Sequence, residues 1–391
     1  MRDTTDWKQV ALIIAAGVIG AAQIGKAAIA IPLLRDELGL SLFAVSWIIG
    51  AYAVLGAFGG LAAALAVSHL PLRQTVIAGL GLIALGNIIG AAAASALPLI
   101  AGRIVEGVGF LGLVIAGPSL LRNMPLGRNQ EIVFACWAAY IPVGTAIMLL
   151  LGPRILQFGW HTLWLVNAAL ALAHGALMLL LRPAETVPAR AAAQPPRAAL
   201  IDFFGSSGPL LLAAAFALYA IQYYALATFL PILLVDRMGL SLDTAGLITA
   251  LAVLANGAGN ISAGVILRLG APLWRITGTV FVAVGLTGFG VFGAGLPTLL
   301  VAGAATAGLA VTALLPASII ASAPKLSGTT QRLALTLGLL QQAAAIGQFV
   351  GPVILAAWVE RFGWSGAAYL LLLIALLGLA IVVRLRRLAP S

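Results

Sequence analysis

Long runs of apolar residues alternate with short polar connections along almost the whole chain. A helix that crosses the hydrocarbon core of a bilayer, about 30 Å thick, needs about 20 apolar residues, and each run reaches that length. The pattern therefore predicts an all-α membrane protein with twelve transmembrane helices. The runs lie at about residues 10–34, 44–68, 75–94, 98–121, 131–152, 162–181, 208–234, 244–267, 275–294, 298–322, 333–357 and 364–383.

The sixth and seventh runs are separated by a longer polar break that contains four prolines and three arginines. Prolines and scattered charges favour a loop over a packed element, so we expect a flexible cytoplasmic linker. The predicted organisation is an N-terminal six-helix bundle at 1–181, a linker at 182–207 and a C-terminal six-helix bundle at 208–391. The first apolar run is too long for the core of a signal peptide, so it is expected to be a retained helix.

The two halves share an internal repeat. The sequence IPLLRDELGLSL at 31–42 corresponds to LPILLVDRMGLSL at 230–242, and a GP pair followed by FGW occurs at 152–160 and again at 351–364. Two motif pairs at nearly one offset, about 200 residues, predict two related bundles with pseudo-symmetric structures.

Composition excludes a large soluble domain. Hydrophobic residues make up 62% of the chain and charged residues 8%, whereas soluble chains carry about 25% charged residues. The formal charge of +10 does not indicate nucleic-acid binding, because the basic residues stand singly between apolar runs. With the N-terminus inside, fifteen Lys and Arg residues face the cytoplasm and four face outward. This asymmetry predicts cytoplasmic termini in a plasma or bacterial inner membrane.

Metal and redox chemistry have little support in the sequence. Cys136 is the single cysteine, and His69, His161 and His174 are far apart in the chain. Neither a nucleophile–base constellation nor a phosphate-binding loop is present. We therefore expect no enzyme activity, no metal and no cofactor.

Two parallel six-helix halves joined by a cytoplasmic linker are the layout of the major facilitator superfamily, which the chain resembles over essentially its whole length. The residues that carry the resemblance are Trp47 and Tyr52 in the second run, Arg103, Gly107 and Gly109 in the fourth, Gly144, Gly152 and Pro153 in the fifth, and Gly347, Gly351 and Pro352 in the eleventh. The loop after the second run departs from the family pattern and keeps only its last basic position, Arg73. The resemblance implies secondary active transport by alternating access.

Three ionisable residues lie well inside predicted helices: Lys26, Arg103 and Glu106. A charge near the bilayer centre costs about 2.5 kcal/mol or more, so each suggests a function. Lys26 and Glu106 are both about 12 Å below the outer surface, so an ion pair between them is possible. Arg103 is spaced i, i+3 from Glu106 and competes for it. Alternatively, Arg103 and Glu106 form a fixed packing pair, and Lys26 reaches outward to the interface.

The three charges sum to +1, which a monoanion would neutralise. Polar faces in other runs would complete the site, although the amides could instead join helices. The predicted substrate-binding residues are Gln23, Lys26, Arg103, Trp137, Tyr140, Tyr219, Gln222, Tyr223, Asn256, Gln341 and Gln342. Glu106 is the predicted proton carrier.

The leading interpretation is a proton-coupled secondary transporter, expected to be monomeric, for a small organic monoanion. One alternative is proton-driven efflux of lipophilic drugs, favoured by the antiporter-like Gly152-Pro153 signature. A second alternative is a non-transporting membrane scaffold or sensor. The expected partners are a small solute, protons and the lipid bilayer, with no nucleic acid.

Overall fold

All secondary structure is helical in the residues that the computed structural model describes, which are 5–67, 70–181, 203–327 and 330–388. The chain divides into two compact units, Met1–Ala193 and Gln194–Ser391. The division falls inside the linker predicted at 182–207. Most of that linker, residues 182–202, lies outside the described residues.

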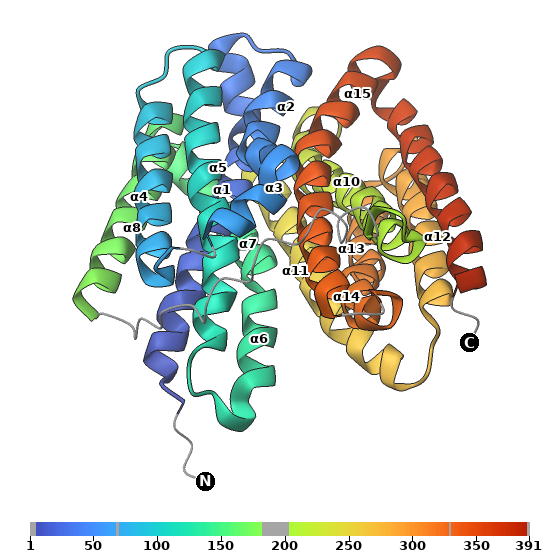
Figure 1. The fold of residues 1–391 in the computed structure, drawn as a ribbon. Helices are drawn as coiled ribbons and strands as arrows, with labels where there is room; N and C mark the ends of the chain where they lie inside the picture. Colours follow the sequence, from blue (N-terminus) through green and yellow to red (C-terminus); the bar gives the residue numbers. More distant parts are fainter. Residues whose placement is uncertain (1–4, 68–69, 182–202, 328–329, 389–391) are drawn as a thin grey trace. The chain divides into compact units, whose positions relative to one another are not determined.

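Figure 1 shows the helices of the first unit in blue to green. They are α1 (Trp7–Leu38), α2 (Leu42–Gly50), α3 (Val54–Val67), α4 (Leu72–Ala91), α5 (Ala96–Arg122), α6 (Gln130–Ala138), α7 (Tyr140–Leu156) and α8 (Trp160–Leu181), with 3₁₀ segments at Ala51–Ala53 and Gly127–Asn129.

The helices of the second unit follow in yellow-green to red (Figure 1). They are α10 (Ser207–Asp236), α11 (Leu242–Arg268), α12 (Leu273–Phe292), α13 (Thr298–Thr312), α14 (Leu314–Ser327) and α15 (Thr330–Leu388).

The repeated GLSL motif forms the same helix-to-helix turn in each unit. Gly39 follows α1 with φ 61° and Gly239 follows α10 with φ 65°, a left-handed conformation that glycine adopts without a steric penalty. Two residues later, Ser41 and Ser241 accept hydrogen bonds from the backbone N–H three positions ahead, at 3.1 and 3.3 Å. These serines cap α2 and α11. The motif thus ends one helix and starts the next.

The repeated FGW motif also contains a glycine turn. Gly159, with φ 87°, separates α7 from α8, and Gly363, with φ 70°, is a break that divides α15 into two helices. Ten helices in the described ranges could span a membrane, or eleven when α6 and α7, bent by 45°, count as one. Dividing α15 at Gly363 gives twelve, as the apolar runs predict.

Three of the predicted runs are interrupted. The second contains the 3₁₀ turn at Ala51–Ala53, the fifth is broken at Ala139 and the tenth at Ala313. These breaks lie within continuous apolar sequence, so hydrophobicity alone did not predict them.

Helices α4 and α5 pack with their backbones in contact. A Cβ atom placed on Gly86 would lie 2.4 Å from the carbonyl oxygen of Gly102, and one on Gly109 would lie 2.3 Å from that of Gly79. Small residues permit such close approach between membrane helices. This contact brings the middle of α4 next to Glu106 on α5, because the Cβ on Gly86 would also lie 2.6 Å from Cγ of Glu106.

Candidate functional site

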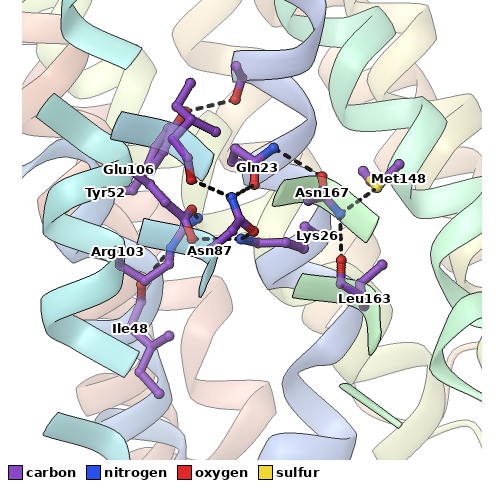
Figure 2. A network of polar contacts seen from close by, with 12 residues as sticks. Gln23, Lys26, Ile48, Tyr52, Asn87, Arg103, Glu106, Met148, Leu163 and Asn167 are labelled. Carbon is purple, nitrogen blue, oxygen red and sulfur yellow. Dashed lines mark hydrogen bonds and ion pairs between the residues drawn. The ribbon is translucent and has the colours of Figure 1, made fainter. Parts of the chain in front are cut away.

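The three charged residues predicted inside the membrane form one cluster in the first unit (Figure 2). Nζ of Lys26, on α1, lies 2.8 Å from Oε1 of Glu106, on α5. The guanidinium of Arg103, one turn earlier on α5, binds Oε2 of the same carboxylate. All three side chains are at most 1% exposed. Burial of charged groups requires such pairing, because an isolated charge in a low-dielectric interior is strongly disfavoured.

The contacts of Lys26 and Arg103 differ from the sequence-based expectation in two ways. Lys26 and Arg103 do not compete for Glu106, because each cation binds a different carboxylate oxygen. The alternative in which Lys26 reaches outward is wrong. Its ammonium group also donates to Oδ1 of Asn87 at 2.7 Å and lies 4.3 Å from the centre of the Trp164 ring. The lysine is therefore held between α4, α5 and α8.

A row of amides extends the cluster across the unit. Nδ2 of Asn87 donates to Oε1 of Gln23 at 3.1 Å, and Nε2 of Gln23 donates to Oδ1 of Asn167 at 3.0 Å. Asn167 in turn donates to the Leu163 carbonyl at 2.8 Å and contacts the sulfur of Met148 at 3.5 Å (Figure 2). Gln23 thus belongs to a closed hydrogen-bond network that joins α1, α4 and α8.

Asn87 and Asn167 were not among the residues predicted from the sequence. A signal was available, because both are amides inside apolar runs. In the structure both are at most 1% exposed. A buried amide without a partner costs about 1–3 kcal/mol, so an isolated mid-membrane Asn implies a polar neighbour.

Arg103 is positioned by the irregular second span. Its Nε donates to the Ile48 carbonyl at 3.1 Å, and its guanidinium lies 4.3 Å from the centre of the Tyr52 ring. Tyr52 sits in the 3₁₀ turn after α2 and donates to the carbonyl of Gly20 at 2.7 Å. The end of α2 and the 3₁₀ turn that follows it thus bring a carbonyl and an aromatic face to the same guanidinium.

The predicted residues Trp137 and Tyr140 lie at the far end of an aromatic row that begins at Tyr52. Ring centres are 5.0 Å apart for Tyr52 and Phe110, 6.4 Å for Phe110 and Tyr140, and 4.8 Å for Tyr140 and Trp137. Trp137 also fills a niche made by Gly17 on α1 and Gly117 on α5. The row links the charged cluster to the packed core of the first unit.

The second unit holds a neutral polar group on α10 and α11. Nδ2 of Asn256 donates to the hydroxyl of Tyr219 at 3.2 Å, and the rings of Tyr219 and Tyr223 stack at 5.9 Å. Gln222, on the same stripe of α10, is fully buried, and neither of its amide atoms has a partner among the described residues. Gln341 is exposed and Gln342 is partly buried, both on α15.

The chemistry available in the first unit is acid–base and electrostatic. Glu106 carries one negative charge between two cations, so its protonation would leave both cations without their counter-ion. In the described ranges, no group of three His, Cys, Asp or Glu residues is arranged to hold a metal ion.

The chain is similar to known proteins in both sequence and fold. The family profile described as Major Facilitator Superfamily matches residues 12–275 and 212–391. The methylenomycin A resistance protein of Bacillus subtilis is 27% identical over 159 residues, which are 40% of this chain and 34% of that protein. The uncharacterized MFS-type transporter EfpA of Mycobacterium tuberculosis is 29% identical over 152 residues, 37% of this chain and 28% of that protein. The chain thus spans about a third of the length of these relatives.

Solved structures match over nearly the whole chain. A bacterial homologue of the human lysosomal transporter Spinster, in an inward-facing and occupied conformation, has a TM-score of 0.79 at 14% identity and covers 98% of both chains. A variant of the nucleoside transporter NupG has a TM-score of 0.79 at 13% identity, with 97% of this chain and 99% of that chain covered. At such identities the likeness establishes the fold, and together with the profile match it shows that this multi-pass membrane protein belongs to the Major Facilitator Superfamily.

Proposed function

We propose that this protein is a proton-coupled secondary transporter whose cargo is a small organic monoanion. The observation that supports this proposal is a single carboxylate, Glu106, shared by two fully buried cations. With all three groups ionised the cluster carries +1, and protonation of Glu106 would raise it to +2. A bound cargo of charge −1 would return the cluster to +1, which limits the net charge inside a medium where charge is costly.

Protonation of Glu106 is the proposed switch. The neutral acid interacts far less strongly with Lys26 and Arg103 than the carboxylate does, so the Lys26 ammonium becomes available to an anionic cargo. Loss of the proton restores the ion pair and displaces the anion. One proton and one monoanion would then move together by alternating access, as in other transporters built from repeated halves.

The neutral polar residues would bind the remainder of the cargo. Gln222 offers a buried donor and acceptor that have no partner among the described residues, and Tyr219 and Tyr223 present aromatic surface beside it. Exposed Gln341 and partly buried Gln342 complete this proposed set. Family membership supports a transport protein over an enzyme or a scaffold, and a scaffold predicts no solute flux at all.

Efflux of lipophilic compounds is a second candidate, favoured by one relative that is named a methylenomycin A resistance protein. In that case, the Lys26–Glu106 pair would carry protons without binding the cargo. The two candidates differ in whether Lys26 contacts the transported molecule.

Ligand-dependent thermal stability separates the two. The purified protein is heated with lactate, benzoate or salicylate, and separately with ethidium or tetraphenylphosphonium. We expect a monoanion to raise the melting temperature of the wild type and of the control Lys325→Ala, but not of Lys26→Ala. Stabilisation of Lys26→Ala by the same anion would refute the proposal. Stabilisation of the wild type by the lipophilic cations alone would favour efflux.

Flux tests the proton switch directly. In proteoliposomes with an imposed pH gradient, the stabilising anion should accumulate with the wild type, and Glu106→Gln should abolish that gradient-driven accumulation. Intact, pH-dependent transport by Glu106→Gln would show that another group carries the proton.

A further inference from the structure

A groove of about 480 Å³ lies in the second unit between the start of α10 and the end of α15. Pockets that hold small molecules commonly have volumes of about 300–1,000 Å³. The groove is lined by Ser207, Leu210, Leu211, Ala214, Arg384 and Arg387. The α10 residues follow the i, i+3, i+4, i+7 spacing of one helix face, and the two arginines share a face of α15 at i, i+3.

Polarity changes along the groove. Ser207 is the first residue of α10, and Ala214 lies about 10 Å further along the helix at 1.5 Å per residue. The arginines lie within about one turn of the end of α15. No side chain caps the first turn of α10, so its backbone N–H groups add positive potential at the charged end. The groove is thus cationic at its rim and apolar deeper in the membrane.

The surrounding end of the unit is suited to a membrane interface. The guanidinium groups of Arg275 and Arg386 each lie 5.1 Å from the ring centre of Trp274, near the start of α12. Tryptophan and arginine at a helix end commonly mark the headgroup level. The Arg386 contact joins the end of α15 to the start of α12.

Acidic groups do not neutralise this end in the described residues. Asp236 ends α10, Asp243 begins α11 and Glu360 precedes the break in α15, so all three lie at the other end of their helices. Neither Arg384 nor Arg387 has an ion-pair partner in the described part of the chain.

We propose that this groove binds an anionic phospholipid. The phosphate lies between Arg384 and Arg387, and an acyl chain runs along Leu210, Leu211 and Ala214. Basic pockets between transmembrane helices recognise anionic headgroups in this way. A soluble anion would gain nothing from the apolar wall, and a lipid without net charge would leave two guanidinium groups uncompensated.

Native mass spectrometry of the purified protein titrated with phosphatidylglycerol tests the site. The Arg384→Gln/Arg387→Gln variant should bind about thirtyfold more weakly, which corresponds to about 2 kcal/mol for two arginines at a membrane surface. The control Arg268→Gln/Lys325→Gln removes two exposed charges from the same end of the unit and should bind within about twofold of the wild type. Equal losses in the two variants would mean general charge attraction and would overturn the proposal.

The apolar part is tested with both arginines in place. Ala214→Trp fills the groove and should reduce phosphatidylglycerol binding about as strongly as the double arginine variant. Glycerol phosphate, which has the headgroup without the chains, should not compete at equal concentration. Unchanged binding by Ala214→Trp, or full competition by glycerol phosphate, would overturn the lipid assignment.

Discussion

The two units place different chemistry at one position of the repeat. Pro32 corresponds to Pro231, an offset of 199, so Gln23 corresponds to Gln222 and Lys26 to Ala225. Both glutamines are fully buried. Gln23 bonds to two asparagines, whereas Gln222 has no partner among the described residues.

This difference suggests a division of tasks. In the first unit the buried polar groups bind one another, because its cations, carboxylate and amides are joined by ion pairs and hydrogen bonds within the unit. The second unit has no buried charge among its described residues and leaves one amide for a molecule from outside, either cargo or water. A shared scaffold therefore carries a buried charged cluster in one half and unused hydrogen-bonding capacity in the other.

The largest effect is expected from removing the shared carboxylate. Glu106→Gln leaves two cations buried without their counter-ion, and breaking a buried pair typically costs about 3–5 kcal/mol. The melting temperature of the purified protein should fall strongly, while the exposed control Asp243→Asn should leave it unchanged. A shift no larger than the control's would mean that water reaches the cluster and that the first unit is not closed.

Backbone contacts should respond alike in the two units. A Cβ on Gly144 would lie 2.3 Å from the carbonyl oxygen of Val18, and one on Gly347 would lie 2.3 Å from Cβ of Ala220. Gly144→Ala and Gly347→Ala should each reduce stability by about 1–3 kcal/mol through overpacking. Gly81→Ala, which meets nothing within 4 Å, should be neutral or slightly stabilising. A loss of stability from only one of the two alanine variants would show that the helix contacts in the two units are not equivalent.

The smallest change in stability is expected when the two corresponding glutamines, Gln23 and Gln222, are replaced. Gln23→Leu removes three hydrogen bonds of the buried amide, with Asn87, Asn167 and the Ile19 carbonyl, and should lower stability by roughly 1–2 kcal/mol. Gln222→Leu removes an amide with no described partner, so thermal denaturation should show no loss or a small gain. If Gln222→Leu is as destabilising as Gln23→Leu, the amide has a structural role and the contrast between the units disappears.

Much of this architecture could be predicted from the sequence because its signals are local. Apolar run length indicated the spans, and the repeat that contains Gly39 and Ser41 indicated two related halves. In the structure this repeat forms the same turn in each unit, with a left-handed glycine and a serine cap. The depths of Lys26 and Glu106 below the outer surface, about 12 Å each at 1.5 Å per residue, indicated that they could meet.

The remainder depends on how helices rotate about their axes. Helices with apolar residues on every side give little rotational signal, so the sequence did not show that Asn87 and Asn167 face α1. The same limit explains why Lys26 and Arg103 were expected to compete for Glu106. The 3₁₀ turn that places Tyr52 against Arg103 interrupts an unbroken apolar run, so composition did not mark it either.

The close contact of α4 with α5 has a consequence for mutational scans. Gly86 has no functional group, yet any side chain there would meet the backbone of α5 and Cγ of Glu106 within 3 Å. Substitution would displace the acid from Lys26 and Arg103. In a mutational scan scored by growth or uptake, substitutions of this glycine would therefore be as harmful as those of the charged residues. Such a scan alone would not distinguish a residue that only permits close packing from one that takes part in transport.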